Sequence, residues 1–156
     1  MTDKKPREER VKLLLIQGAN MEWLGRRQPE VYGTTTAAEL DAILLEEAKR
    51  HGVELDIFYT NVEGEAITRI YQAARDGIDG LMMNPAGFNY AGYALRDCLR
   101  GVELPYVEVH MSNIERRGIP SIPSSEADGM ITGMGIDSYL LGLDALIRVV
   151  KKKRAA

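Results

Sequence analysis

The chain has 156 residues, of which 45% are hydrophobic and 28% are charged, and this is the composition of a globular protein with a hydrophobic core. Its formal net charge of -3 gives no indication of a nucleic acid or an anionic membrane as partner. With Cys98 as the only cysteine and only two histidines, the sequence excludes an intrachain disulfide and predicts no metal site.

Residues 1–10 are charged, and we predict a flexible N-terminal tail there, followed by a single domain over residues 11–156. This start is not a signal peptide, and no apolar stretch approaches the ~20 residues of a membrane span, so we expect a cytoplasmic protein with no membrane partner. Residues 11–17 are continuously apolar, which predicts a buried strand. Residues 18–33 form a polar loop, longer than the about two to six residues usual in a strand-to-helix connection, and such loops often act as lids.

Strands and helices alternate along the rest of the chain. Thr36-Ala-Ala-Glu39 is typical of a capping box and predicts a helix to about Arg50, ended by Gly52. Further strands are predicted over 53–60, 80–84, 105–112 and 129–132, further helices over 63–75, 91–100 and 136–151, and a loop rich in proline and serine over 113–128. This alternation favours an α/β fold, a flavodoxin-like three-layer sandwich whose five-stranded parallel sheet, in the order 2-1-3-4-5, has helices on both faces.

The predicted strand over 105–112 carries the strongest chemical signal in the sequence. Strand side chains alternate between faces, so Glu108, His110 and Ser112 share one face and apolar residues share the other. Ligands of open α/β sheets bind at the end where these polar residues lie. A carboxylate beside a histidine fixes its tautomer and stabilises its charged form, which suits proton transfer. The alternative is a hydrogen-bonded buried histidine without a chemical role.

Polar residues also follow the other strands at the same edge of the predicted sheet. Asn20 follows the first strand, Asn84 closes the third, and Asn61 follows the second in an off-centre position. In the loop over 18–33, an arginine beside Tyr32 would favour the phenolate, a plausible base for a carbon acid. Alternatively Arg26 and Arg27 are solvated and Tyr32 packs on the core, and the spacing does not choose between these interpretations.

Taken together, these motifs resemble the type II 3-dehydroquinate dehydratases over about residues 11–150. The blocks that carry the resemblance are Gln17-Gly-Ala-Asn20, Arg26-Arg-Gln-Pro-Glu-Val-Tyr32-Gly33, Asn61-Val-Glu63-Gly-Glu65, Asn84-Pro85, Ala94-Leu-Arg96-Asp97, Glu108-Val-His110-Met-Ser112-Asn113 and Gly133-Met-Gly135. The resemblance implies a flavodoxin-like subunit in a homo-oligomer, a dodecamer of four trimers, with no cofactor and no metal. It also implies a small-molecule carboxylate substrate and an anti elimination of water through an enolate.

The resemblance implies a catalytic role for each matching residue. Tyr32 would be the base that removes a proton beside the ketone, with Arg27 favouring its phenolate. Asn20 would hold a water that donates to the enolate oxygen. His110 would protonate the leaving hydroxyl, and Glu108 would orient and charge His110.

Other matching residues would bind the substrate. Asn84, Ser112 and the backbone around Met111 would hold its carboxylate. Arg117 matches a second family arginine, and Asp97 would reach into the site of a neighbouring subunit.

The sequence also departs from the family pattern where ring hydroxyls are bound. Tyr90 stands in place of a hydroxyl-binding histidine, and the segment after Asn113, which supplies a hydroxyl-binding arginine in the family, is shorter and reads Gly118-Ile-Pro-Ser121. The family's N-G-P-N is Gln17-Gly-Ala-Asn20 here. An unsatisfied hydroxyl-binding group costs ~1–3 kcal/mol of affinity.

Two interpretations therefore stay open. One is an ordinary dehydratase in which Tyr90 and the new loop replace the lost contacts. The other is a diverged lyase, or a hydrolase, that uses the same site on a different keto- or hydroxy-carboxylate. A binding module without activity would have lost the proton-transfer groups, which are all present, and is disfavoured.

Overall fold

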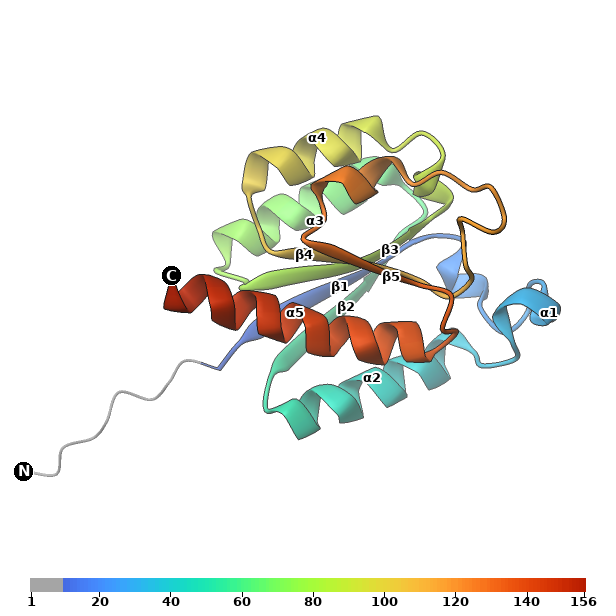
Figure 1. The fold of residues 1–156 in the computed structure, drawn as a ribbon, viewed down its shortest axis with the longest axis horizontal. Coiled ribbons are helices and arrows are strands. Elements are labelled where there is room, and N and C mark those ends of the chain that lie inside the picture. Colours follow the sequence, from blue (N-terminus) through green and yellow to red (C-terminus); the bar gives the residue numbers. More distant parts are fainter. Residues whose placement is uncertain (1–9) are drawn as a thin grey trace, which may run out of the picture.

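A computed structural model describes residues 10–156, so the predicted tail lies outside the described residues except for Arg10. Five parallel strands form one sheet in the order β2-β1-β3-β4-β5, which confirms the predicted flavodoxin-like order (Figure 1). The strands are β1 (Lys12–Ala19), β2 (Glu54–Tyr59), β3 (Gly80–Ala86), β4 (Tyr106–His110) and β5 (Gly129–Thr132).

Helices cover both faces of this sheet. Figure 1 shows α2 (Ala37–His51) and α5 (Asp137–Ala155) on one face, and α3 (Glu63–Arg75) and α4 (Tyr93–Val102) on the other. Each pair of helices packs on the sheet through its own cluster of buried apolar side chains. The predicted cap of α2 is present, because the Thr36 hydroxyl accepts a hydrogen bond of 3.1 Å from the Glu39 amide. No helix in the described part of the chain is long and apolar enough to cross a membrane.

Several predicted boundaries were wrong by a few residues. Strand β3 continues past Pro85, because Ala86 still pairs with Ala19 of β1. Helix α4 begins at Tyr93 rather than at residue 91, and β4 ends at His110, so Ser112 lies just beyond the strand. Helix α5 runs on to residue 155, where basic side chains suit a helix C-terminus. The two predicted loops contain short helices: η1 (Met21–Trp23), α1 (Pro29–Tyr32) and η3 (Ile122–Glu126), while η2 (Gly87–Asn89) follows β3.

Two glycines permit close packing behind the carboxyl edge of the sheet. A Cβ on Gly18 would lie 2.2 Å from the Pro85 carbonyl oxygen, so only glycine lets β1 and β3 approach this closely. A Cβ on Gly142 of α5 would lie 2.4 Å from Cγ1 of Val109, on the apolar face of β4. Helix α5 therefore presses directly on the back of the strand that carries His110.

Candidate active site

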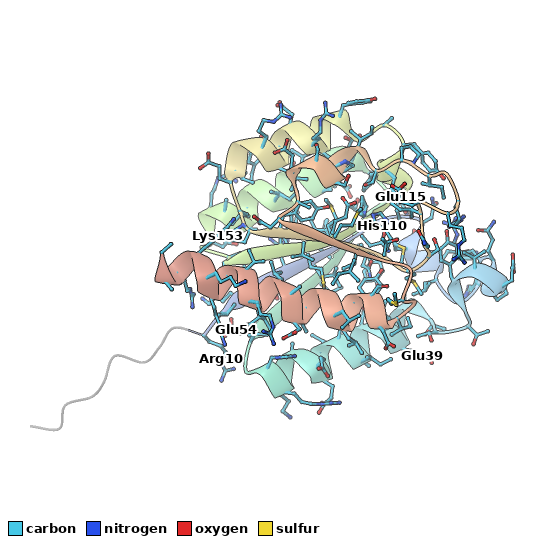
Figure 2. All side chains as sticks on the ribbon, viewed as in Figure 1. Arg10, Glu39, Glu54, His110, Glu115 and Lys153 are labelled. Atoms are coloured by element: carbon cyan, nitrogen blue, oxygen red, sulfur yellow. The ribbon has the colours of Figure 1, made fainter. Side chains whose placement is uncertain are left out.

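A cavity opens at the carboxyl edge of the sheet, at the end of β4. Figure 2 shows His110 at this end, opposite the end where Lys153 and Arg10 lie. The cavity is lined by Asn20, Met21, Leu24, Arg27, Tyr32, Asn84, Ala86, Gly87, Asn89, Tyr90, His110, Met111, Ser112, Ile114, Arg117 and Ile119. All the candidate site residues of the sequence analysis therefore line one cavity, except Glu108 and Asp97.

Glu108 lies beneath the cavity and pairs with His110. Both side chains point to the same face of β4, as the strand alternation predicts, and Glu108 Oε2 lies 2.7 Å from His110 Nε2. Because the carboxylate is fully buried and accepts this contact, the facing ring nitrogen is the one that bears a proton. The carboxylate thus fixes both the tautomer and the orientation of the ring.

Two hydroxyl groups that the sequence analysis did not single out also hold the Glu108 carboxylate. Tyr106 Oη donates to Oε1 at 2.6 Å, and Ser121 Oγ donates to Oε2 at 2.7 Å. Burial, and then the nearby carboxylate, raise the pKa of Tyr106 well above its usual range, so its phenol stays a donor. Tyr106 shares the alternating face with Glu108 and could have been found by its period, whereas Ser121 lies in an irregular loop that offers no such signal.

Two arginines flank Tyr32 at the mouth of the cavity. The guanidinium carbons of Arg27 and Arg117 lie 5.3 and 5.6 Å from the centre of the Tyr32 ring. Arg117 Nη1 also donates to Tyr32 Oη at 3.0 Å and to Ser112 Oγ at 2.8 Å. Arg26 instead stacks on Trp23 and does not line the cavity. Both interpretations of this loop hold in part, because the Tyr32 ring packs against the core while its hydroxyl meets a guanidinium.

The Asn84 amide is held in one orientation by its neighbours. Its Nδ2 donates to Tyr139 Oη at 2.8 Å, and its Oδ1 accepts from the Ala86 amide at 3.0 Å. Tyr139 Oη in turn donates to Gln17 Oε1 at 2.8 Å, and burial raises the pKa of this phenol. Ala86 has a φ of 46°, a region that favours glycine, so the backbone beside Asn84 is strained. Asn84 Nδ2 also lies 3.5 Å from Met21 Sδ, a weak acceptor that lines the same cavity.

We expect Tyr139→Phe to lower the free energy of unfolding by about 1–3 kcal/mol, because it leaves polar atoms of Gln17 and Asn84 buried without this partner. Urea denaturation measures the change. Tyr93→Phe, which alters an exposed tyrosine on α4, is the control and should change stability little. Equal stability of both variants would mean that the Tyr139 hydroxyl is not required to satisfy this buried network.

Asn20 reaches the cavity from a backbone in the left-handed region, with a φ of 77°. The backbone N–H of Asn20 donates to Asn61 Oδ1 at 2.8 Å, and the Asn61 side-chain Nδ2 donates in turn to the Glu22 carboxylate. Asn61 is therefore off-centre as predicted, since it supports Asn20 from outside the cavity. Gly87 leaves room for the Asn20 amide, because a Cβ there would lie 3.2 Å from Asn20 Nδ2.

Asp97 lies on α4 and does not line this cavity. Its predicted role requires a second subunit and stays a prediction. Sequence reasoning missed the apolar wall of the cavity, because apolar side chains are common in cores. It also missed the amide of Asn89, which belongs to no motif that indicates a site. Among residues 10–156, no group of histidine, cysteine, aspartate and glutamate side chains is arranged to hold a metal ion.

Comparison with known proteins identifies the family to which this sequence and fold belong. A family model for class II dehydroquinases matches residues 11–147. The chain belongs to this family. Among its relatives, the 3-dehydroquinate dehydratase of Thioalkalivibrio sulfidiphilus is 42% identical over 144 residues, which cover 90% of this chain and 98% of that protein. The 3-dehydroquinate dehydratase of Xanthomonas oryzae pv. oryzae is 46% identical over 138 residues, which cover 86% of this chain and 93% of that protein.

Solved structures of class II dehydroquinases also match the fold. The type II dehydroquinase from Butyrivibrio crossotus has a TM-score of 0.84 at 33% identity, and the match covers 88% of this chain and 98% of that chain. A 3-dehydroquinate dehydratase-like protein from Bifidobacterium longum has a TM-score of 0.68 at 30% identity, covering 90% of this chain and 98% of that chain. The family resemblance drawn from the motifs is therefore confirmed.

Proposed function

We propose that this chain is a 3-dehydroquinate dehydratase that eliminates water through an enolate. The relatives named above, 42% and 46% identical, support the substrate and the reaction. The observation that carries the proposal is that a phenol between two guanidinium groups and a carboxylate-paired imidazole line the same cavity. One group suits proton removal and the other suits proton donation.

The elimination begins at Tyr32. Its oxygen, beside the positive charges of Arg27 and Arg117, takes a proton from the carbon next to the substrate ketone. The electrons of that C–H bond move into the carbonyl and form an enolate. Asn20, on the same wall of the cavity, holds a water that donates to the enolate oxygen.

The elimination ends at His110. Its ring, held by Glu108, donates a proton to the leaving hydroxyl, and the C–O bond breaks as the enolate collapses to a conjugated enone. The products are the enone and one water, and the proton taken by Tyr32 equals the one lost by His110. Glu108 orients the His110 ring without contacting the substrate, because it lies outside the cavity.

The substrate carboxylate binds between the ends of β3 and β4. The Asn84 amide and the Ser112 hydroxyl line the cavity there, together with the backbone around Met111. Arg117 adds a positive charge at the same wall and already holds Ser112.

Incubation of the purified protein with 3-dehydroquinate, followed by the ultraviolet absorbance of the enone product, tests this function. We expect fast turnover in the wild type and a loss of about 100-fold or more in His110→Ala. Folded wild-type protein without turnover would contradict the proposal. The alternative of a different keto- or hydroxy-carboxylate would then be tested with a panel of such acids.

We expect Tyr90→Phe to raise the KM for 3-dehydroquinate about 3- to 10-fold and to leave kcat within about twofold, because Tyr90 is 59% exposed at the cavity wall and contributes one solvent-accessible hydroxyl. Steady-state kinetics measures both constants. Tyr90→His serves as the matched comparison, since it restores the family residue. A rise in activity of Tyr90→His above wild type would indicate a pocket adapted to another substrate.

We propose in addition that the chain forms a homo-oligomer, a dodecamer of four trimers, in which Asp97 approaches a neighbouring site. Exposed apolar side chains before and on α3 support an assembly: Val62 and Tyr71. Light scattering should give a mass about twelve times the 17.4 kDa of one chain. A monomer would contradict both the assembly and the role of Asp97.

A further inference from the structure

Within residues 10–156, the buried carboxylate of Glu108 has no contact with a lysine or an arginine. Its three hydrogen-bond partners in the described part of the chain are the His110 ring and the hydroxyls of Tyr106 and Ser121. The residue has no exposed surface, so bulk solvent does not reach the carboxylate. A buried carboxylate must be satisfied by donors in the protein, and here two neutral hydroxyls do so alongside the imidazole.

The three donors bind both oxygens of the carboxylate, one on Oε1 and two on Oε2, and this fixes the plane of the group. Tyr106 holds Oε1 from the same strand face, two residues before Glu108, whereas Ser121 and His110 both meet Oε2. The Ser121 hydroxyl also lies 3.3 Å from Asn89 Oδ1, but its single proton belongs to the shorter contact of 2.7 Å with Glu108. With both oxygens held, Glu108 cannot turn about its last bond, and the His110 ring cannot turn with it.

Ser121 also joins this buried group to the opposite side of the cavity. It lies in the same segment as Arg117, which donates to Tyr32, and the turn between them is closed by a hydrogen bond of 2.9 Å from the Ile119 amide to the Ile114 carbonyl. One short segment therefore contacts the candidate base directly and the candidate acid through its carboxylate.

We propose that Tyr106 and Ser121 are positioning residues of this enzyme, which hold Glu108 and thereby keep the His110 ring, with its Nε2 on the carboxylate, oriented so that its other nitrogen can donate a proton to the substrate. The inference rests on the proposed function, because it assigns a role in the same elimination. Neither hydroxyl lines the cavity, so neither contacts the substrate directly, and the shortest contact of each is with Glu108. The segment that carries Ser121 and Arg117 sets the positions of both proton-transfer groups at once.

Kinetics of Tyr106→Phe and Ser121→Ala test the proposal. Each variant should lower kcat about 10- to 100-fold, because each removes a hydrogen bond to a charged group, while KM stays within about twofold. Ser121→Thr keeps the hydroxyl and should recover most of the activity. Controls are Tyr59→Phe, which removes a tyrosine–carboxylate bond to Asp41 away from this cavity, and the exposed Ser125→Ala in the same segment. Unchanged kcat in both test variants would overturn the proposal.

A second measurement does not depend on turnover. The chain has only two histidines, so the hydrogen-bonded ring proton of His110 can be assigned in proton NMR spectra as the downfield resonance absent from His110→Ala. We expect this resonance in the wild type and its loss or broadening in Tyr106→Phe and in Ser121→Ala, because the freed ring proton exchanges with water. A resonance equally sharp in both variants would overturn the positioning role. Wild-type protein that shows the resonance but does not convert 3-dehydroquinate would instead contradict the proposed function.

Discussion

Tyr32→Phe should lower kcat for 3-dehydroquinate about 10²- to 10⁴-fold and leave KM within a few fold, because it removes the oxygen that takes the substrate proton and little else. The ring and its contacts with Arg27 and Arg117 are retained, and in the part of the chain that the structure describes the lost hydroxyl accepts one hydrogen bond, from Arg117. Absorbance of the enone product measures the rate, and urea denaturation should show nearly unchanged stability.

Tyr93→Phe provides the matched control for this variant. It removes a hydroxyl from an exposed tyrosine whose ring also contacts an arginine, Arg96, but which lies on α4 and outside the cavity. Wild-type kcat in Tyr32→Phe would exclude Tyr32 as the base. The general acid could then stay assigned to His110, but another group would have to remove the proton.

Glu108→Gln should lower kcat about 10²- to 10⁴-fold, although the side chain keeps its shape. In the wild type, the hydroxyls of Tyr106 and Ser121 and the His110 ring donate to the carboxylate. A neutral amide removes the negative charge beside His110, and its NH₂ group would face donors instead of meeting an acceptor. In Ser-His-Asp hydrolases the corresponding change from carboxylate to amide costs about 10⁴-fold in kcat, through the wrong histidine tautomer. Steady-state kinetics measures the effect.

Glu115→Gln is the control, because Glu115 is exposed on the loop beside the site, as Figure 2 shows, and does not line the cavity. It should retain wild-type kcat within about twofold. Activity of Glu108→Gln within a few fold of wild type would mean that His110 does not need a charged partner. The buried pair would then be structural, the alternative that the sequence analysis left open.

Much of this architecture follows from local patterns. The period of two in residues 106–112 places Glu108 and His110 on one face, where their side chains meet at 2.7 Å. The alternation of strands and helices is sufficient for a parallel sheet, and parallel strands bring their carboxyl ends to one edge. For that reason Asn20, Asn84 and His110 could be expected in one site although they lie far apart in the sequence.

Other contacts depend on how distant segments pack. Arg117 meets Tyr32 across 85 positions of sequence, and Tyr139 meets Asn84 across 55, through side chains whose direction no periodicity specifies. The spacing alone also left open whether Arg26 or Arg27 lies beside Tyr32, and only the family resemblance assigned that place to Arg27. Adjacent loop residues point in directions that the turn geometry sets. Ser121 reaches Glu108 only because an irregular loop folds back over the end of β4. Local patterns therefore predict which edge bears the chemistry, while long-range packing selects the partners that orient it.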